Sequence, residues 1–574
     1  MQRSVYVKQP AVPTNPMGAT KKRKRQAPKG RTVDAQALAE VEALVAEPRR
    51  HELLIEYLHR INDRYGQLGA PHLAALAQLL RLAQTEVYEV ATFYHHFDVV
   101  KEGPGGGVAA PAALTVRVCD GLSCEMAGAR QLLERLPALL GREVRVIPAP
   151  CVGRCEEAPV AVVHQKPVPR ATAESVQTEI QAGHLHHEPE PYTGFAAYLA
   201  EEGYSLLRDC MEGRRELEGV LKTMEDSGLR GLGGAGFPAG RKWRIVRGER
   251  APRLMAVNID EGEPGTFKDR WYLERDPHRF LEGMLIAAWA VGIAAIYIYL
   301  RDEYHGCRAI LEAELAKLQA NPPVAGLPKI ELRRGAGAYI CGEESAMIES
   351  IEGKRGMPRL RPPYVAQVGL FGRPTLEHNF ETLYWVRELL EKGGAWFASH
   401  GRNGRKGLRS FSVSGRVRSP GVKLAPAGIT ARELIDEFCG GMQAGHTFYG
   451  YLPGGASGGI LPASKGDIPL DFDTLQPHGC FIGSAAVIVL STRDTAKDAA
   501  RNMMRFFEHE SCGQCTPCRV GTAKANLLMA HDRWDQPLLA ELSQVMRDAS
   551  ICGLGQAAPN PVDCVMKYFP DELA

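Results

Sequence analysis

The sequence lacks an uninterrupted apolar run long enough to cross a membrane. The nearest candidate, Met284 to Leu300, falls short of the roughly 18 to 20 residues that a spanning helix needs, and Arg301 and Asp302 close it. A secretory leader is also missing from the N-terminal residues. We therefore expect a cytoplasmic chain with no direct membrane contact.

A strong net charge is missing as well. The chain has 69 Lys and Arg residues against 67 Asp and Glu residues, which leaves a formal net charge of +2. This balance provides no overall attraction to nucleic acid or to an acidic membrane. The one concentrated charge is a basic arm at residues 1–33, which contains no acidic residue and which we expect to be disordered.

Cysteine, by contrast, is plentiful. Fourteen cysteines in a chain without a secretory leader indicate metal or redox chemistry rather than a disulfide framework. Eight of them form two spaced sets. The other six are predicted to be ordinary thiols: Cys210, Cys307, Cys341, Cys439, Cys480 and Cys564.

With 574 residues the chain is long enough for several domains. Hydrophobic periodicity and the glycine- and proline-rich breaks predict a multidomain fold of mixed α/β and α+β class. The predicted order is the basic arm 1–33, a helical bundle 34–105, a thioredoxin-like α/β domain 112–182, a linker 183–196, a Rossmann-like α/β domain 197–408, a β-grasp-like domain 409–490 and a helical domain 491–574.

The stretch Ser227 to Trp243 combines a high density of glycine with aromatic and charged residues that could bind a ligand. Removing side chains lets backbone N–H groups approach a phosphate or a flat ring, while Phe237 offers an aromatic face and Lys242 a charge. A flexible linker is the alternative, but linkers seldom combine Phe, Pro, Lys and Trp in one run. The segment is neither a Rossmann fingerprint, because no apolar strand precedes it, nor a P-loop. The glycines are Gly228, Gly231, Gly233, Gly234, Gly236 and Gly240.

Two later segments combine glycine with acidic residues. In the first, Asp260, Glu261 and Glu263 follow Asn258 on one loop. These carboxylates would repel phosphate, so hydroxyls, amides or a cation are the expected partners, and an exposed acidic turn is the alternative. The second segment, 333–345, places two acids after a glycine run and opens a helix.

The first cysteine set consists of Cys119 and Cys124, spaced C-x4-C, and Cys151 and Cys155, spaced C-x3-C. Four thiolates in two loop pairs can surround the two irons of a [2Fe–2S] cluster. Structural zinc uses similar pairs and stays open as the alternative.

The second set is C-x2-C-x2-C plus one distant cysteine: Cys512, Cys515, Cys518 and Cys552. This spacing matches a cubane [4Fe–4S] cluster. Zinc seldom uses three ligands this close together, and a thioredoxin-type redox pair needs only two.

Taken in order, these motifs resemble a known family. Residues from about 34 to 185 resemble the 24-kDa-type [2Fe–2S] subunit of NADH dehydrogenases, and residues from about 197 to 570 resemble the 51-kDa-type flavoprotein subunit, which binds FMN, NAD(H) and a [4Fe–4S] cluster. The motifs are Gly-Leu-Gly-Gly-Ala-Gly-Phe-Pro, Asn-x-Asp-Glu-Gly-Glu-Pro-Gly, Gly-Ala-Tyr-Ile-Cys-Gly-Glu-Glu, Glu-Ser-Cys-Gly-Gln-Cys-Thr-Pro-Cys-Arg and the two N-terminal cysteine pairs.

The resemblance assigns candidate site residues. Phe237 would stack on NAD(H), Glu263 and Glu344 would position its amide and ribose, and we take Phe237 and Glu263 as the candidate catalytic residues. Arg361 and Tyr364 would contact the outer half of the nucleotide. The residues implied for FMN are Gly231, Gly233, Gly234, Gly236, Lys242, Asn258, Asp260, Glu261, Tyr339, Gly342, Glu343, His378 and Asn379.

Three departures from the complex I form matter. Leu232 replaces a common arginine, and the pair Gly458-Gly459 differs from the usual sequence. His378 stands where an asparagine pair is usual, so a phosphate contact by His378 would depend on pH and Asn379 is the surer ligand.

Modules of this kind occur in complex I, in NAD-reducing hydrogenases and in the β subunit of NAD-dependent Mo/W formate dehydrogenases. The fused order and the segments 203–210, 421–426 and 454–462 most resemble the formate dehydrogenase branch. That resemblance implies formate oxidation on a Mo/W-pterin, iron–sulfur-rich α subunit, a hetero-oligomeric complex and NAD+ as acceptor. The alternative from another class is a zinc-stabilised nucleotide-binding scaffold.

Overall fold

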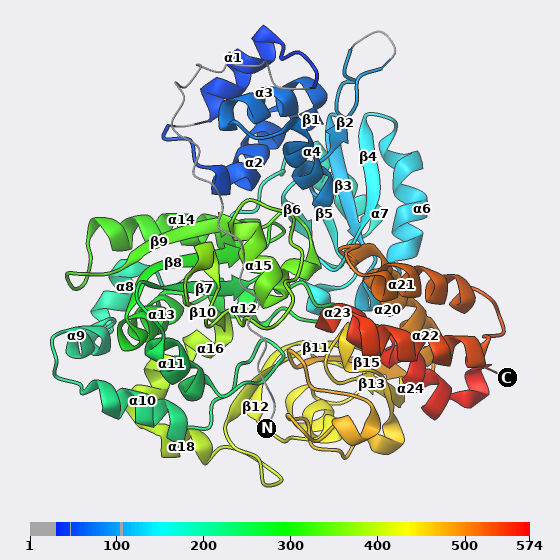
Figure 1. Cartoon of the computed structure of the whole chain (residues 1–574). Coiled ribbons are helices and arrows are strands. Elements are labelled where there is room, and N and C mark those ends of the chain that lie inside the picture. Colours follow the sequence, from blue (N-terminus) through cyan, green and yellow to red (C-terminus); the bar gives the residue numbers. More distant parts are fainter. Residues whose placement is uncertain (1–29, 46, 104–106, 574) are drawn as a thin grey trace, which may run out of the picture.

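A computed structural model describes residues 30–45, 47–103 and 107–573, and Figure 1 shows its elements in chain order. The expected disordered arm lies outside the described residues, except for positions 30–33. There Arg31 exchanges hydrogen bonds with Gln84, whose side chain accepts from its N–H and donates to its carbonyl. This end of the arm therefore contacts the first helical unit.

The N-terminal unit is helical, as the sequence predicts. Its apolar residues recur every three or four positions, so that Leu54, Tyr57, Leu58 and Ile61 are all buried on one face of the second helix. A short parallel pair of strands closes the unit. The elements are α1 (Ala35–Leu44), α2 (Leu54–Tyr65), β1 (Leu68–Gly69), α3 (Ala70–Leu80), α4 (Gln84–Phe93) and β2 (Val99–Val100).

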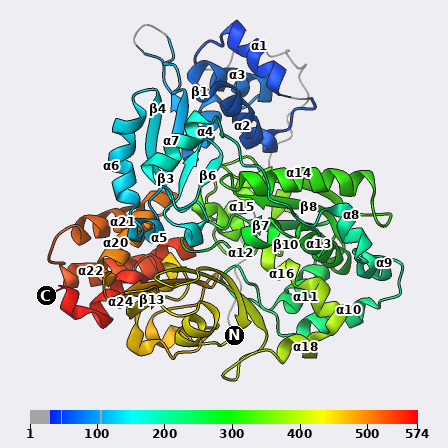
Figure 2. The same cartoon turned by 180° about the vertical axis from the view of Figure 1, so that it is seen from behind.

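The next unit is the thioredoxin-like domain. Its four strands lie in the order β4-β3-β5-β6; β3 and β4 are parallel, and the other pairs are antiparallel. Figure 2 shows α6 and α7 beside this sheet. The elements are β3 (Leu114–Cys119), α5 (Leu122–Met126), α6 (Ala129–Leu140), β4 (Val144–Ala149), β5 (Ala161–Val163), β6 (Lys166–Val168) and α7 (Ala173–Gln181).

The predicted linker holds no helix or strand until α8 begins at Phe195, but it is not simply a solvated tether. The Tyr192 hydroxyl and the Phe195 N–H both donate to the buried Glu314, at 2.7 and 2.9 Å. A buried carboxylate needs such donors, and the linker supplies two of them. Four helices follow: α8 (Phe195–Ala200), α9 (Ser205–Met211), α10 (Leu217–Asp226) and α11 (Ala239–Gly248).

The third domain has a four-stranded, all-parallel sheet in the order β10-β7-β8-β9. The two inner strands, β7 and β8, are largely buried and apolar, as expected for a sheet covered by helices on both faces, whereas the edge strand β9 is charged and partly exposed. The strands are β7 (Arg253–Ile259), β8 (Ile293–Leu300), β9 (Lys329–Arg334) and β10 (Thr375–Asn379). The helices are α12 (Lys268–Leu273), α13 (Pro277–Val291), α14 (His305–Ala320), α15 (Glu344–Ile351), α16 (Phe380–Tyr384), α17 (Val386–Lys392) and α18 (Gly394–Ala398).

The β-grasp-like domain is a mixed five-stranded sheet, ordered β12-β11-β15-β13-β14, in which only β11 and β15 are parallel. The helix expected over 430–438 is a single α-helical turn, α19 (Ala431–Glu433), that widens into a π-helical turn over Leu434–Phe438. The strands are β11 (Leu408–Gly415), β12 (Gly421–Pro426), β13 (Phe448–Leu452), β14 (Leu461–Pro462) and β15 (Ala486–Ser491).

The C-terminal unit is helical, with α20 (Ala496–Glu510), α21 (Thr516–Met529), α22 (Gln536–Ala549), α23 (Gly553–Ala557) and α24 (Asn560–Tyr568). It packs on the β-grasp-like sheet and beside the thioredoxin-like domain, as Figures 1 and 2 both show. One shared core joins these units to the N-terminal helices.

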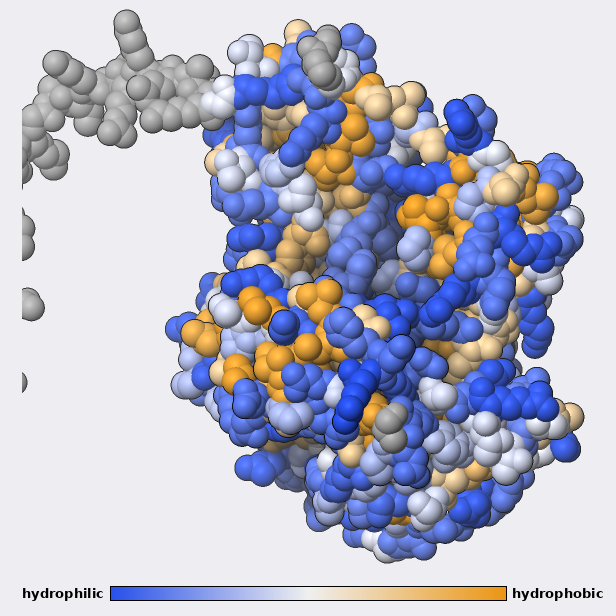
Figure 3. Space-filling model, turned by 90° about the vertical axis from the view of Figure 1, so that its right-hand side faces the viewer, coloured by the Kyte–Doolittle hydropathy of each residue, from blue (hydrophilic) through white to orange (hydrophobic). Residues whose placement is uncertain are grey.

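The face on the right of Figure 1 is drawn in Figure 3. Its apolar side chains form separate patches among hydrophilic ones, and a hollow separates its upper and lower parts. Within the described ranges, every helix is too short or too polar to span a bilayer.

Candidate functional site

The glycine-rich segment forms a closed loop between α10 and α11. The Gly231 N–H donates to the Phe237 carbonyl at 2.8 Å, and Ala239 N–H donates to Leu229 at 2.9 Å, so both ends of the loop are held together. Gly236 has a φ of +67°, and a Cβ there would lie 2.4 Å from the Phe472 ring. Only glycine both adopts this positive φ without strain and lacks the Cβ that would clash with Phe472.

This loop packs against the end of strand β10. A Cβ on Gly233 would lie 2.9 Å from the Cβ of Asn379, and the Leu232 N–H donates to the Thr382 hydroxyl at 2.9 Å. The Leu232 side chain is buried in the core of the parallel-sheet domain. At this position, where the resemblance expects an arginine, the chain has a packing residue.

The other predicted loops meet the glycine loop because parallel strands end at one edge of a sheet. Asn258 is the last residue but one of β7, Asn379 ends β10, and the segment 335–344 follows β9. The Asn258 amide donates to the Gly342 carbonyl at 2.9 Å, which joins the two glycine–acid loops. Ligands of open α/β sheets bind at this carboxyl edge.

Asp260 is the carboxylate that is left without a partner at this edge. It is buried, its Oδ2 has no hydrogen-bond partner among the described residues, and burial raises its pKa well above the usual range. Together with Gly262 and Tyr339 it lines a cavity of about 220 Å³. An orphaned buried acceptor at a cavity fits a bound group that carries hydroxyl or N–H donors, as the ribityl chain and flavin ring do.

Glu261, which is also predicted to bind the cofactor, makes contacts within the protein. Its carboxylate accepts from the N–H groups of Asp269 and Arg270, at 2.7 and 3.0 Å, and from the Tyr304 hydroxyl at 2.8 Å. The side chain thus caps the start of α12, where the first backbone N–H groups of the helix need acceptors.

Glu263 is held by two other segments of the chain. Ser457 donates to it through its N–H at 2.8 Å and through its hydroxyl at 2.6 Å, and the Tyr339 hydroxyl donates to its other oxygen. Burial raises the pKa of this carboxyl above its ordinary value. Sequence reasoning missed Ser457, although the Gly-Gly-Ala-Ser-Gly-Gly run around it was a visible signal.

The residues predicted to bind the nucleotide lie at the more solvent-exposed side of the candidate site. Phe237 is 40% exposed, and Tyr364 is 55% exposed. Arg361 pairs with Glu343 and, at 2.9 Å, with Glu344, whose pKa burial raises. Both contacts use the Nη2 atom of Arg361, whose side chain is 40% exposed.

Lys242 and Glu343 make contacts within the protein. The Lys242 ammonium donates to the Glu377 carbonyl at 3.0 Å and lies 3.3 Å from its carboxylate. One Glu343 oxygen accepts from the N–H groups of Ser345 and Ala346, so the side chain caps α15.

His378 lies beneath the loop rather than at its surface. The indole N–H of Trp243 donates to its Nε2 at 2.8 Å, and the ring is buried. Burial lowers the pKa of His378 well below its ordinary value. A neutral, buried imidazole fits a structural contact that holds α11 against β10. It gives no support to the predicted pH-dependent contact between His378 and a phosphate.

Asn379 joins a buried ion cluster. Its amide donates to Asp269 at 2.6 Å, and Asp269 lies 2.7 Å from the ammonium of Lys268, which also pairs with Glu381 at 3.0 Å. Burial raises the pKa of Asp269 to about 7. Sequence reasoning missed Lys268, because a single lysine inside a helix carries no motif.

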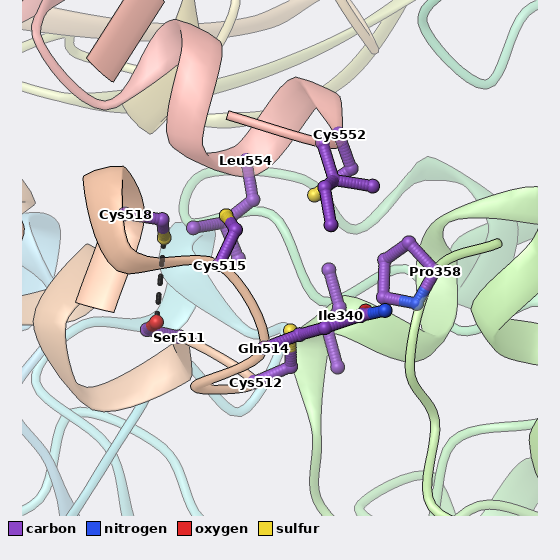
Figure 4. A pocket seen from close by; sticks show the side chains of 10 residues that line it. Ile340, Pro358, Ser511, Cys512, Gln514, Cys515, Cys518, Cys552 and Leu554 are labelled. Atoms are coloured by element: carbon purple, nitrogen blue, oxygen red, sulfur yellow. Dashed lines mark hydrogen bonds between the residues drawn. The ribbon is translucent and has the colours of Figure 1, made fainter. Parts of the chain in front are cut away.

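The second cysteine set surrounds one cavity, which Figure 4 shows. Cys512, Cys515 and Cys518 come from the start of α21 and the turn before it, and Cys552 precedes α23. Ile340, from the second glycine–acid loop, lines the same cavity. Four thiols facing one apolar cavity are a donor set that fits a [4Fe–4S] cluster.

The first cysteine set lies at the ends of β3 and β4. All four thiols are buried, and the Sγ atoms of Cys151 and Cys155 are 3.3 Å apart. A Cβ added at Gly121 would lie 3.6 Å from the Cys119 Sγ and 3.4 Å from the Cys151 Cβ, so the two loops face each other. This donor set fits a [2Fe–2S] cluster.

The [2Fe–2S] loops dock directly on the acidic loop. The buried guanidinium of Arg301 donates to the carbonyls of Cys151 and Glu261, both at 2.7 Å. Arg270 donates to the Gly153 carbonyl at 2.9 Å and pairs with Glu156. Sequence reasoning missed both arginines, since their partners in the cysteine loops are more than a hundred residues away.

Comparison with known proteins agrees with this arrangement. Residues 41–183 match the thioredoxin-like [2Fe–2S] ferredoxin family, residues 224–388 the Nuo51 FMN-binding domain, and residues 498–574 the NADH-ubiquinone oxidoreductase-F iron–sulfur binding region.

Individual relatives cover most of the chain. The mitochondrial NADH dehydrogenase [ubiquinone] flavoprotein 1 of Dictyostelium discoideum is 42% identical over 372 residues, which span 62% of this chain and 78% of that protein. The mitochondrial 51 kDa subunit of the NADH-ubiquinone oxidoreductase of Neurospora crassa is 40% identical over 374 residues, spanning 62% and 76%.

Among solved structures, an NAD+-reducing [NiFe]-hydrogenase in the H2-reduced state superposes with a TM-score of 0.79 and 33% identity, over 92% of both chains. The chain therefore belongs to the 51-kDa NADH dehydrogenase flavoprotein family, with a thioredoxin-like [2Fe–2S] domain, an FMN-binding domain and a [4Fe–4S] domain, and it is an NADH-dehydrogenase-type flavin iron–sulfur oxidoreductase.

Proposed function

We propose that this chain is the NAD(H)-binding β subunit of a cytoplasmic NAD-dependent formate dehydrogenase. Formate is oxidised to CO2 on a separate Mo/W-pterin, iron–sulfur-rich α subunit, and this chain passes the electrons to NAD+. The cytoplasmic location and the α subunit are parts of the same proposal.

One observation carries the electron-converting role: one loop contacts the candidate flavin edge and the [4Fe–4S] cysteines. The Tyr339 hydroxyl donates to Glu263, and the Tyr339 N–H donates to Glu510 at 2.9 Å, two residues before Cys512. Its neighbour Ile340 lines the cysteine cavity. On the other side, Arg301 joins the acidic loop to Cys151. The candidate flavin edge thus has a cysteine set on each side.

Bound FMN supplies the chemistry that such a position requires, because it exchanges hydride with nicotinamide and single electrons with iron–sulfur clusters. The contribution of the protein is positioning. Phe237 offers an exposed ring face for the nicotinamide, and Glu263, fixed by Ser457 and Tyr339, offers an acceptor for its amide. Hydride transfer needs no general base, so we assign none.

The formate branch is supported by three segments that resemble its β subunits. One of them, 454–462, contains the residue that holds Glu263, since Ser457 donates to it twice. A second, 203–210, contains Tyr204, whose N–H donates to the buried Glu282 at 3.0 Å. These two segments therefore shape the site and the adjoining core rather than a distant surface.

The second candidate is the corresponding subunit of an NAD-reducing hydrogenase. The observation that favours it is the similarity to the hydrogenase chain over 92% of both chains, which includes the [2Fe–2S] part as well as the flavoprotein part.

Anaerobic purification of the tagged full-length chain from its own cells tests the proposal. We expect a co-purifying subunit that contains molybdenum or tungsten, together with formate-dependent reduction of NAD+. A nickel-containing partner with hydrogen-dependent activity would support the second candidate instead. An iron-replete chain without flavin would contradict both candidates.

A further inference from the structure

A cluster of two histidines and one glutamate lines the same cavity as Asp260 and Tyr339, and its two histidines have no role in the cofactor sites described above. His95 follows helix α4 of the N-terminal helical unit, whereas His509 and Glu510 end helix α20 of the C-terminal unit. Donor atoms of the three side chains all lie within 4.8 Å of one another. Residues more than four hundred positions apart therefore present two imidazoles and a carboxylate to one point.

The two imidazoles are stacked, with ring centroids 4.0 Å apart and an angle of 28° between the rings. Neither ring nitrogen of His95 has a hydrogen-bond partner in the described part of the chain. The Nδ1 of His509 lies 3.1 Å from the Oε1 of Glu510. The other Glu510 oxygen accepts from the Tyr339 N–H at 2.9 Å, which fixes the carboxylate.

Negative groups lie near the cluster, and Arg117 and Arg301 line the same cavity. The last turn of α20 places the negative end of the helix dipole at this point. Glu303 lines the cavity that contains His95, His509 and Glu510, and Asp120 and Glu508 line a second cavity that also contains His509. Both histidines are exposed and Glu510 is buried, so an ion can enter from solvent and meet a fixed anion.

We propose that His95, His509 and Glu510 form a binding site for a divalent transition metal ion of the zinc type, which links the N-terminal helical unit to the [4Fe–4S] unit. Two imidazoles and a carboxylate with a fourth position open to water are a ligand set that zinc uses. Imidazole ligands also suit nickel and copper, whereas magnesium and calcium prefer oxygen ligands.

The geometry requires only a local change. With metal–nitrogen bonds of about 2.1 Å, tetrahedral donors lie about 3.4 Å apart. The His509–Glu510 pair is already close to that spacing at 3.1 Å. Rotation of the exposed His95 ring out of the stack brings its free nitrogen to the third position.

The site is tested on the full chain with both clusters and flavin in place. After treatment with a chelator, the protein is equilibrated with Zn2+, and zinc, iron and flavin are counted per chain. We expect one bound zinc, and we expect His95→Ala and His509→Ala each to weaken zinc binding by at least about 100-fold while iron and flavin stay unchanged.

His184→Ala is the matched control, because His184 is also exposed and also contacts a glutamate, Glu179, at 2.9 Å. X-ray absorption at the zinc edge separates this site from the cysteines, since zinc–sulfur bonds are about 2.3 Å and zinc–nitrogen bonds about 2.0 to 2.1 Å. Equal zinc binding by wild type and His95→Ala, a sulfur shell around the bound zinc, or no bound zinc in the wild type would each overturn the proposal.

Discussion

Glu263 shows how a single residue of the site depends on distant parts of the chain. Its neighbours in sequence are acids and glycines, yet its hydrogen-bond donors are Ser457 from the β-grasp-like domain and Tyr339 from the loop after β9. A carboxylate held by three donors is rigid, and a rigid acceptor is what a nicotinamide amide needs for a reproducible position.

We predict that Glu263→Gln raises the KM for NADH by about 10- to 100-fold and leaves flavin content unchanged. The reason is the loss of a charged acceptor, since hydrogen bonds to charged groups contribute about 1.5 to 3 kcal/mol. NADH:dye activity of the isolated chain measures the effect. Glu312→Gln, an exposed acid on α14, is the control and should behave as wild type. Loss of flavin with an unchanged KM would contradict the assignment.

At the scale of elements, the glycine loop is shaped by what packs against it. Gly236 lies against the Phe472 ring, which two guanidinium groups cover: Arg230 at 4.5 Å and Arg409 at 4.2 Å from its centroid. The loop therefore rests on the β-grasp-like domain as well as on β10. A change that moves Phe472 also moves the loop.

We predict that Gly236→Ala lowers the retention of FMN and destabilises the chain by about 1 to 3 kcal/mol. The added methyl group meets Phe472 at 2.4 Å, and the φ of +67° disfavours any side chain. Flavin content after gel filtration and a thermal shift measure the two effects.

The control for this prediction is Gly219→Ala. Gly219 lies inside helix α10, and a Cβ there meets nothing within 4 Å. Alanine in an open helical position stabilises by about 0.5 to 1 kcal/mol. If Gly236→Ala retained flavin as well as Gly219→Ala does, the loop would not be the flavin support that we infer.

At the scale of the whole molecule, the units are joined by buried polar contacts as well as by apolar packing. His59 of α2 contacts the Gly335 carbonyl of the parallel-sheet domain at 2.8 Å. Burial, aided by the charge of Arg334, lowers the pKa of His59 to about 3. The imidazole therefore stays neutral in the folded chain at pH values where it takes up a proton in the unfolded chain.

The lowered pKa of His59 makes the folded chain less stable as the pH falls. Its contribution to stability is complete above the ordinary histidine pKa of about 6.5 and is lost as the pH falls from there toward 3, by about 1.4 kcal/mol per pH unit. Between pH 7.5 and 5.5 we expect the free energy of opening of α2, measured by hydrogen exchange, to fall more in wild type than in His59→Gln. An exposed histidine replaced in the same way, His184→Gln, should leave the wild-type difference intact. Equal falls in wild type and His59→Gln would contradict the prediction.

Much of the architecture follows from local patterns. The apolar run Met284 to Leu300, too short to cross a membrane, forms the end of α13 and all of β8, and the two cysteine sets each converge as their spacing predicts. The hydrophobic period of a helix or strand and the spacing of cysteines are local properties, so they can be read from the sequence directly. The His378 ring could not be placed in this way, because its burial depends on Trp243, which is far away in the chain.

The sequence by itself determined the family and the fold class, and it predicts the two iron–sulfur ligand sets, because helix and strand periods, glycine loops and cysteine spacings act over short stretches of chain. Only the tertiary structure decided which carboxylate of the acidic loop faces the cavity. Asp260, Glu261 and Glu263 are nearly equivalent in sequence, yet Asp260 is left unpaired, Glu261 caps α12 and Glu263 is held by Ser457 and Tyr339. The donors that separate the roles of Glu261 and Glu263 come largely from other segments, and their positions are set by packing, which no local pattern records.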